Sequence, residues 1–370
     1  MRKHLLTMML AALAVAAVAQ DFTNRDTLRY EDLTKFRVIN AAVERPLASR
    51  LPAEMKGEVR DDVWYLAGCS AGVGICFSTD SRSIAMRYNV KRDFHMPHMA
   101  DTGIKGVDMY IFDDDDNAWH FLNCNRPTKD SVQVKTFVDR LDGKMHHYMA
   151  YMPLYDGINW IEIGVDSTAV LSQPLVNSPR RERGKIVFYG TSILQGGCAT
   201  RPGMVATSII QRELDRECVN LGFSGHCRMD SCMARMMAAI PDVAAYVIDP
   251  VPNCTKLMCD TVTYGFINYL RTMRPEVPIV MVEGPMYSYA KYSSYYSAYL
   301  PEKNAEFRKN YERLKADNPK NLYYIDCDGL YGPDAEGTVD GIHFTDIGFQ
   351  YYARKVGGVL QAILDKRTRE

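Results

Sequence analysis

Five short apolar runs in the second half of the chain constrain the fold more than any other feature. They occupy residues 186–189, 219–221, 245–248, 279–282 and 322–325, about 25 to 45 residues apart. Segments with helical spacing of apolar residues lie between the runs, one of them marked by Phe307, Tyr311 and Leu314. Buried strands that alternate with helices predict a parallel sheet covered on both faces. We therefore expect a flavodoxin-like three-layer α/β domain with a five-stranded parallel sheet.

The first half has a different pattern. Short runs rich in β-branched and aromatic residues, separated by Gly, Asp and Asn, occupy residues 63–66, 75–77, 83–88, 107–112 and 160–165. Regular short strands without helices between them indicate an antiparallel, jelly-roll-like β-sandwich. Residues 174–184, with two prolines and several charges, resemble a linker. The expected domains are a β-sandwich over residues 20–178 and the α/β domain over residues 179–370.

Residues 1–19 have the composition of a cleavable signal peptide. Arg2 and Lys3 give a basic start, residues 8–19 are an unbroken apolar run, and Ala17-Val18-Ala19 resembles a cleavage site. A membrane-spanning helix needs about 20 apolar residues, so a retained anchor is the less favoured alternative. No later run is long enough to span a membrane. We therefore expect a secreted or periplasmic protein.

Charge and cysteine content argue against several other classes. Lys plus Arg number 44 and Asp plus Glu 45, which gives a net charge of -1 and no basic field for a nucleic-acid partner. The 10 cysteines contain no C-x-x-C pair, which disfavours a zinc ribbon or a thioredoxin-like dithiol. We expect most of them to be small buried side chains, with one or two disulfides left open. The oligomeric state is left open as well.

Residues able to do chemistry follow the predicted strands of the α/β domain. Gly190-Thr191-Ser192 comes after the first strand, residues 222–225 after the second and residues 249–253 after the third, while Asp340-Gly341-Ile342-His343 precedes the last helix. Ligands of such sheets bind beyond the carboxyl ends of the strands. A hydroxyl nucleophile, oxyanion donors and an Asp/His pair are therefore expected at one edge of the sheet. Acyl transfer needs these groups.

Three other patterns could indicate chemistry. Gly68-Cys69-Ser70-Ala71-Gly72 matches the G-x-S-x-G nucleophile elbow, but the strands expected around it favour a Gly-rich hairpin turn. His95 and His98 could chelate a metal, but Pro97 breaks the helix that would align them. The acidic residues 113–116 could bind calcium, although a solvated hairpin turn is favoured. We expect no metal and no cofactor.

With these residues in place, the sequence resembles the SGNH (GDSL-type) hydrolases, and within them the two-domain bacterial branch in which a β-sandwich precedes the hydrolase domain. Gly190-Thr191-Ser192, Gly225, Asn253 and Asp340-x-x-His343 are similar to the four sequence blocks of that family. The resemblance implies that Ser192 is the nucleophile, His343 the base and Asp340 its orienting partner. It also implies an oxyanion hole made by the amides of Ser192 and Gly225 and the side chain of Asn253.

Two positions depart from the family pattern. Thr191 stands where many members have Asp, but that Asp is not one of the three catalytic residues. Pro252 precedes Asn253 in place of the common G-x-N context, which leaves the direction of the Asn253 side chain less defined. Neither departure removes a group that the chemistry needs.

The substrate is indicated less directly. Tyr287, Tyr289 and Tyr292 belong to a tyrosine-rich segment after the fourth strand, where they could bind a sugar face or equally pack on the core. The resemblance, the signal peptide and the sandwich together favour an esterase that removes O-acetyl groups from a carbohydrate. The alternatives are a lipid or broad short-chain esterase and a non-catalytic glycan-binding protein. The Met-rich residues 229–237 could line an acyl trough, but the helical spacing of Met233, Met236 and Met237 favours a place in the core.

Overall fold

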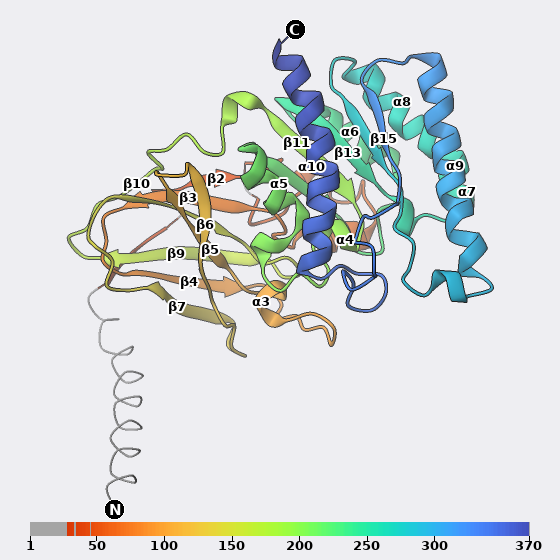
Figure 1. Cartoon of the computed structure of the whole chain (residues 1–370). Helices are drawn as coiled ribbons and strands as arrows, with labels where there is room; N and C mark the ends of the chain where they lie inside the picture. Colours follow the sequence, from red (N-terminus) through yellow and green to blue (C-terminus); the bar gives the residue numbers. More distant parts are fainter. Residues whose placement is uncertain (1–27, 33–34, 45, 370) are drawn as a thin grey trace, which may run out of the picture.

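The second half of the molecule is built around the predicted five-stranded parallel sheet (Figure 1). The computed structural model describes residues 28–32, 35–44 and 46–369, so the predicted signal peptide lies outside the described residues. The strands are β11 Lys185–Gly190, β12 Cys218–Gly222, β13 Val243–Asp249, β14 Ile279–Val282 and β15 Leu322–Ile325. Their order is β12-β11-β13-β14-β15, with every pair parallel. The carboxyl ends of β12, β11 and β13 therefore lie side by side.

Helices cover both faces of this sheet, which confirms the three-layer prediction. Side chains of β11 alternate between two cores, with Ile186 and Phe188 in one and Val187 and Tyr189 in the other. The first core lies under α4 Ser192–Gln195, α5 Ala206–Leu214 and α10 Asp346–Arg369. The second lies under α6 Ser231–Ala239, α7 Lys256–Thr261, α8 Thr263–Met273 and α9 Tyr296–Asp317. Short 3-10 turns in the connections are η4 Ala53–Met55, η5 Arg181–Arg183, η6 Pro202–Met204, η7 Val251–Asn253 and η8 Ala290–Tyr292.

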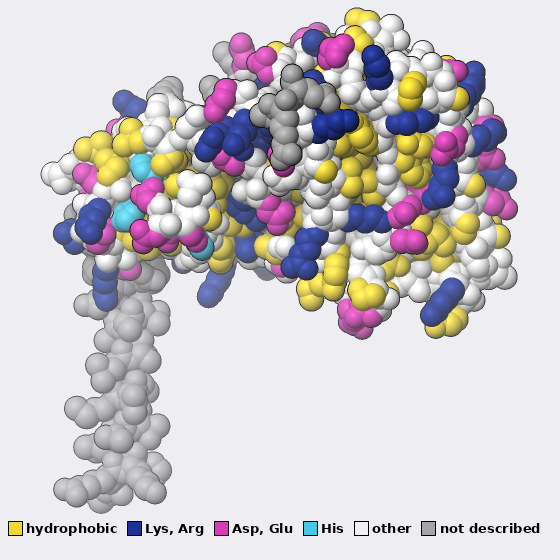
Figure 2. Space-filling view, turned by 45° about the horizontal axis from the view of Figure 1, so that its top comes forward, with side chains coloured by type: hydrophobic (Ala, Val, Ile, Leu, Met, Phe, Trp, Pro, Cys, Tyr) yellow, Lys and Arg dark blue, Asp and Glu magenta, His cyan; other side chains and the backbone are white. Residues whose placement is uncertain are grey.

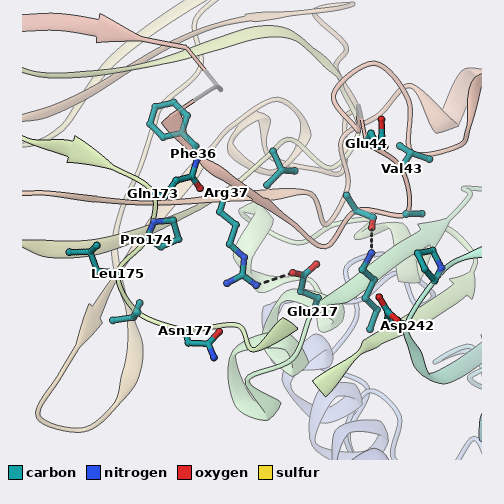
Figure 3. Close-up of a pocket in the computed structure, with 16 residues that line it drawn as sticks. Phe36, Arg37, Val43, Glu44, Gln173, Pro174, Leu175, Asn177, Glu217 and Asp242 are labelled. Carbon is teal, nitrogen blue, oxygen red and sulfur yellow. Dashed lines mark hydrogen bonds and ion pairs between the residues drawn. The ribbon is translucent and has the colours of Figure 1, made fainter. Parts of the chain in front are cut away.

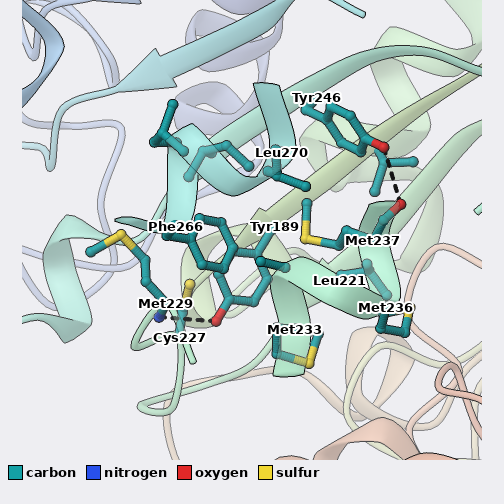
Figure 4. Close-up of a cluster of buried hydrophobic side chains, with 14 of the residues drawn as sticks. Tyr189, Leu221, Cys227, Met229, Met233, Met236, Met237, Tyr246, Phe266 and Leu270 are labelled. Carbon is teal, nitrogen blue, oxygen red and sulfur yellow. Dashed lines mark hydrogen bonds between the residues drawn. The ribbon is translucent and has the colours of Figure 1, made fainter. Parts of the chain in front are cut away.

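The methionines of α6 belong to the hydrophobic core. Met233, Met236 and Met237 are buried in the cluster that Figure 4 shows around Tyr189 and Phe266. The rings of Tyr189 and Phe266 stack there with centroids 5.3 Å apart. The cysteines are free thiols, and all but two of them are buried. This Met-rich helix therefore fills an interior rather than lining an open trough.

The first half consists of two antiparallel sheets packed face to face, as predicted. One sheet contains β1 Leu28–Glu31, β9 Ile158–Asp166, β4 Ile84–Val90 and β7 Val132–Val138. The other contains β10 Leu171–Ser172, β3 Gly74–Thr79, β8 His146–Tyr151, β5 Asp108–Asp113 and β6 Ala118–Cys124, with β2 Arg37–Ile39 paired to β3. Phe77 of one sheet and Tyr88 of the other meet in the shared core.

One predicted strand is wrong. Residues 63–66 lie in a helix, α2 Asp61–Ala67, because Val63 and Ala67 are one turn apart and both bury against the α/β half. Asp61 and Asp62 in its first turn favour the helix electrostatically. The glycine-rich turn of residues 68–72 therefore joins a helix to β3 and is not a hairpin. A further short helix, α3 Asp101–Ile104, precedes β5.

An early segment, residues 37–44 and 46–72, covers the edge of the parallel sheet. The strand β12 is an edge strand, whose outward backbone groups need partners. Oδ1 of Asn40 accepts a hydrogen bond of 3.0 Å from the first backbone N–H of β12. Arg50, only 3% exposed, donates from Nη1 to the carbonyl oxygens of Asn220 and Gly222, both at 2.9 Å. The two halves are thus joined by hydrogen bonds along the sheet edge.

A second contact joins the outer face of the six-stranded sheet to the region of α5. The guanidinium of Arg212 lies 4.3 Å from the ring centroid of Tyr110 and 5.5 Å from that of Tyr151. Beside them Asp108, fully buried, forms an ion pair of 2.7 Å with Arg201. This contact therefore adds buried ion pairing and cation–π packing to the apolar contacts between the halves.

The surface carries charges of both signs. Figure 2 shows Lys and Arg interspersed with Asp and Glu over the face in view. In the ranges that the structure describes, no helix has both the length and the apolar character needed to cross a bilayer.

Candidate active site

Ser192 stands at the carboxyl end of β11, as the first residue of the short helix α4. Thr191 is the N-cap residue of this helix, and Ser192 is 8% exposed. The first N–H groups of a helix have no intrahelical partner, so the amide of Ser192 is available to a ligand. Its Oγ lies 2.9 Å from Nε2 of His343, which is 151 positions away in the sequence. The hydroxyl is therefore hydrogen-bonded to an imidazole at the edge where ligands of such sheets bind.

A tight loop before α10 holds His343 and Asp340 together. Nδ1 of His343 lies 2.7 Å from Oδ2 of Asp340. Oδ1 of the same carboxylate accepts hydrogen bonds from the backbone N–H groups of Ile342 at 3.0 Å and His343 at 2.8 Å. Gly341 has a φ of +86°, a left-handed conformation that glycine adopts without strain. Ser192, His343 and Asp340 thus form one hydrogen-bonded line.

The carboxyl group of Asp340 is ionised in this loop. Partial burial raises its pKa, but hydrogen bonds from the backbone N–H and the imidazole of His343 outweigh burial and lower the pKa to about 2. An ionised Asp340 accepts a hydrogen bond from the N–H at Nδ1 of His343, which leaves Nε2 of that ring as a hydrogen-bond acceptor toward Ser192. This is the tautomer that a general base beside a serine needs.

Gly225 and Asn253 follow the two strands next to β11. Gly225 is exposed with a φ of +72°, and a Cβ added there would meet nothing within 4 Å. Oδ1 of Asn253 accepts a hydrogen bond of 3.2 Å from the backbone N–H of Cys227. That bond fixes the amide so that its Nδ2 donors remain for another acceptor. Both residues therefore offer N–H groups at the edge that carries Ser192.

The tyrosine-rich segment lies against the loop of Asp340 and His343. The backbone N–H of Ser288 donates to the carbonyl of Gly341 at 2.9 Å, and a Cβ on Gly341 would lie 3.0 Å from the ring of Tyr289. Tyr289 is 39% exposed, whereas Tyr292 is 80% exposed. Tyr287 is half-buried and packs on Tyr289 at a centroid distance of 5.7 Å. Of the three predicted substrate-binding tyrosines, Tyr289 contacts the site loop, and Tyr287 supports it.

The first half adds groups that sequence reasoning missed. The hydroxyl of Tyr155 donates to the carbonyl oxygen of Ser192 at 3.2 Å. A Cβ on Gly197 would lie 2.9 Å from that hydroxyl and 3.3 Å from Cδ2 of His343, so only glycine fits there. No local pattern marks Tyr155, because its role depends on a contact between the two halves.

His95 and His98 do not form the pair that the sequence analysis considered. Nδ1 of His95 lies 2.9 Å from Oδ1 of Asp101. The ring of His98 lies instead beside that of His343, with centroids 5.7 Å apart. Cys198 is nearby, and the ligand atoms of His98, Cys198 and His343 lie within 4.8 Å of one another. Burial, reinforced by the charge of Asp340, raises the pKa of the Cys198 thiol to about 12.

The acidic run forms the turn between β5 and β6, so the predicted hairpin is confirmed. Asp113, Asp116 and His120 offer ligand atoms within 4.8 Å of one another, and all three are exposed. Nε2 of His120 lies 2.6 Å from Oδ2 of Asp116. Exposed carboxylates gather in many turns without a metal, so this cluster is not assigned as a site.

The G-x-S-x-G match at residues 68–72 is buried inside the molecule. Ser70 is fully buried, and its Oγ has no hydrogen-bond partner among the described residues. A Cβ on Gly72 would lie 2.6 Å from Cβ of Asn220, which shows how closely this turn packs on β12. Residues 68–72 therefore form a packed connection that a substrate cannot reach.

A cavity of about 860 Å³ lies at the opposite ends of the parallel strands (Figure 3). Its lining includes Lys185, the first residue of β11, and Asp242, which precedes β13. Arg37 and Glu217 form a largely buried ion pair of 3.0 Å within it. The cavity is therefore separate from the edge that carries Ser192.

Comparisons with known proteins agree with this architecture. Residues 183–361 match the GDSL-like lipase/acylhydrolase family, and residues 28–171 match a family described as the N-terminus of SGNH hydrolase-type esterases. A protein described as a GDSL-like lipase from Bacteroides ovatus is 30% identical with a TM-score of 0.85, over 91% of this chain and 98% of that one.

Two more distant structures share the fold. A salicylyl-acyltransferase from a tetracycline biosynthetic pathway is 16% identical with a TM-score of 0.72, over 90% of this chain and 98% of that one. An acetyl xylan esterase from the rumen bacterium Butyrivibrio proteoclasticus is 11% identical with a TM-score of 0.58, over 92% and 99% of the two chains. No curated protein sequence matches the chain.

Proposed function

The chain belongs to the GDSL-like lipase/acylhydrolase family, and from this premise we propose that it is a serine esterase that removes short acyl groups, acetyl above all, from a carbohydrate. The observation that carries the proposal is the hydrogen-bonded line of Ser192, His343 and Asp340 at the carboxyl edge of the parallel sheet. We further propose that the chain is exported, because residues 1–19 have the pattern of a signal peptide.

The mechanism follows from the roles of these three residues. His343 accepts the proton of Ser192 through Nε2 while Oγ attacks the ester carbonyl, and Asp340 stabilises the imidazolium. The negative oxygen of the tetrahedral intermediate is bound by the amides of Ser192 and Gly225 and by Nδ2 of Asn253. His343 then protonates the departing sugar hydroxyl, leaving an acyl-serine. Water, activated by the same imidazole, hydrolyses this ester, releases the acid and restores Ser192.

The surroundings of Ser192 support a short acyl group. The segments beside it, residues 195–198 and 224–226, are short and mostly polar. A trough for a long chain would contribute about 0.8 kcal/mol for each buried methylene, and it needs a continuous apolar wall. The Met-rich helix α6 could have supplied that wall, but its methionines are packed in the core. The lipid esterase alternative therefore lacks its main structural support.

A carbohydrate is supported by the tyrosines near the site. Tyr289 presents a half-exposed ring beside the loop of Asp340 and His343, where an apolar sugar face could pack. The fold is shared with an acetyl xylan esterase, which is compatible with such a substrate. Export would place the enzyme outside the cytoplasm, where polysaccharides are found.

The test compares acyl chain length and acceptor. Acetate release is measured from a panel of acetylated polysaccharides, beside turnover of p-nitrophenyl acetate, butyrate and octanoate. We expect kcat/KM for acetyl esters to exceed that for octanoyl esters strongly, with acetate released from at least one polysaccharide. A rate that rises steadily from acetyl to octanoyl would instead establish a lipid esterase.

A further inference from the structure

Three side chains from separate segments meet beside the catalytic line. His98 comes from the loop before α3 in the first half, Cys198 from the turn after α4, and His343 from the loop before α10. One ligand atom of each lies within 4.8 Å of the other two. For two nitrogens and one sulfur around a tetrahedral Zn²⁺, the ligand atoms are about 3.3 to 3.5 Å apart, given Zn–N of about 2.0 Å and Zn–S of about 2.3 Å. Shifts of about 1 Å would therefore bring all three into the zinc shell.

Two of these groups have no part in ester hydrolysis. His98 makes no hydrogen bond in the described part of the chain, although each other described histidine has a hydrogen-bonded partner. Cys198 is a buried free thiol with a φ of +75°, a conformation uncommon for residues other than glycine. The free imidazole of His98 and the thiol of Cys198, beside the imidazole of His343, form a ligand set that the proposed mechanism does not explain.

The surroundings of His343 match those of a metal ligand. Histidines that bind zinc usually donate their other ring N–H to a carboxylate, which fixes the ring and raises its basicity. Asp340 holds Nδ1 of His343 in this way at 2.7 Å, so Nε2, the acceptor of the Ser192 hydroxyl, carries the lone pair that a metal would take in its place. Two imidazoles and one thiolate select a thiophilic transition metal such as Zn²⁺ over Mg²⁺ or Ca²⁺.

We propose that His98, Cys198 and His343 form a site for Zn²⁺ or a similar thiophilic cation, and that its occupation blocks the enzyme. The two neutral imidazoles each donate a lone pair, the Cys198 thiol releases its proton to solvent as the S–metal bond forms, and water fills the fourth position. The metal takes the lone pair of Nε2 that would accept the proton of Ser192. The site itself does not depend on ester hydrolysis, whereas the inhibition rests on the proposed function.

Binding is measured first, without substrate. Co²⁺ added to the metal-free protein should produce sulfur-to-cobalt charge-transfer absorption, which Zn²⁺ then displaces, and calorimetry gives the affinity for Zn²⁺. Cys198→Ser should abolish the charge-transfer band. His98→Ala, which removes an exposed imidazole, should weaken Zn²⁺ binding at least about 10-fold. Cys327→Ser, at a half-buried thiol outside the cluster, and His120→Ala, in the exposed hairpin, are matched controls expected to bind as the wild type does.

Inhibition is measured next, with the rate of each variant normalised to its own metal-free rate. Zn²⁺ should inhibit hydrolysis of p-nitrophenyl acetate by the wild type, and both site variants should need at least about 10-fold more Zn²⁺. EDTA should raise the rate of zinc-treated enzyme. The proposal is overturned if the wild type gives no charge-transfer band, or if the site variants bind like the controls. Loss of the rate on chelation would also overturn it, because the metal would then be required. A protein that binds Co²⁺ as described but cleaves no ester would contradict only the proposed function.

Discussion

The two halves of the molecule contribute unequally to the candidate active site. The parallel sheet of the second half brings Ser192, Gly225 and Asn253 to one edge, because parallel strands all end there. The antiparallel sheets of the first half have no such edge and supply no group to the hydrogen-bonded line. Yet Tyr155 and His98 of this half reach the site, and Arg50 supports the strand behind it. Under the proposed mechanism, the first half therefore shapes and supports a site whose reacting atoms come from the second half.

The sharpest test of this division compares one serine from each half. Ser192→Ala should lower kcat by about 10⁴-fold or more, because the nucleophile is lost while the oxyanion donors remain. Ser70→Ala, in the other half, should keep nearly full activity, since its buried hydroxyl has no hydrogen-bond partner among the described residues. Turnover of p-nitrophenyl acetate measures both. If Ser70→Ala were the inactive variant, the assignment of the reacting half would be reversed.

A second test asks whether the halves unfold together. Arg50→Met keeps an apolar stem of similar length but removes the side-chain donor from the buried carbonyls of Cys69 in one half and of Asn220 and Gly222 in the other. Each such carbonyl costs about 1–3 kcal/mol, so we expect a loss of more than about 4 kcal/mol in the free energy of unfolding. Arg92→Met, on the same half but less buried, should cost less than about 1.5 kcal/mol.

Urea unfolding followed by fluorescence and circular dichroism measures both variants. One coincident transition is expected for the wild type. Two separate transitions, with neither changed by Arg50→Met, would show that the sandwich unfolds independently. The first half would then not support the second.

The third prediction compares two buried aspartates. Asp108 of the first half has Arg201 as its partner, whereas Asp249 at the end of β13 has the hydroxyl of Tyr352 at 2.8 Å. Burial raises the pKa of Asp249 to about 7 from 3.8, so the folded protein holds a proton that the unfolded chain releases between these values. The resulting stability is full below about pH 3.8 and is lost as the pH rises to about 7.

Asp249→Asn should remove this pH dependence. Between about pH 4 and pH 8, the free energy of unfolding of the variant should rise by up to about 4 kcal/mol relative to that of the wild type. A shift of about three units in the pKa of Asp249 implies a change of this size. Asp108→Asn should destabilise the protein at both pH values, because Arg201 is left with a weaker partner. Urea titrations at the two pH values measure the effect, and parallel curves for Asp249→Asn and the wild type would contradict it.

The smallest expected effect concerns the substrate. Tyr289→Ala should raise KM for an acetylated polysaccharide about 5-fold, which corresponds to about 1 kcal/mol of aromatic contact, and should leave p-nitrophenyl acetate unchanged. Tyr65→Ala removes an exposed tyrosine of the first half and should change neither KM. An equal effect of the two variants would place the polysaccharide on both halves rather than beside Asp340 and His343.

The second half was the more predictable from sequence. Its strands are buried on both faces, so each is a continuous apolar run such as residues 279–282, and its polar site residues follow these runs directly. In the first half, residues 63–66 combine β-branched and aromatic side chains that favour a strand locally. Packing of Val63 and Ala67 on the other half makes them helical. His98, Tyr155 and Arg50 could not be placed, because their partners are distant in sequence and only the packed halves bring them together.

The covered edge of β12 limits how chains of this kind can be recombined. A fusion that cut the gene between residues 171 and 183, where the two family matches meet, would separate β12 from Asn40 and Arg50. The freed carbonyls of Asn220 and Gly222 would form an open template for pairing with a neighbouring chain. A fusion of the second half to a new partner domain would therefore need another segment to cover β12 in place of residues 37–72. The two parts should therefore fold well only as one chain, even though the proposed reacting atoms belong to one of them.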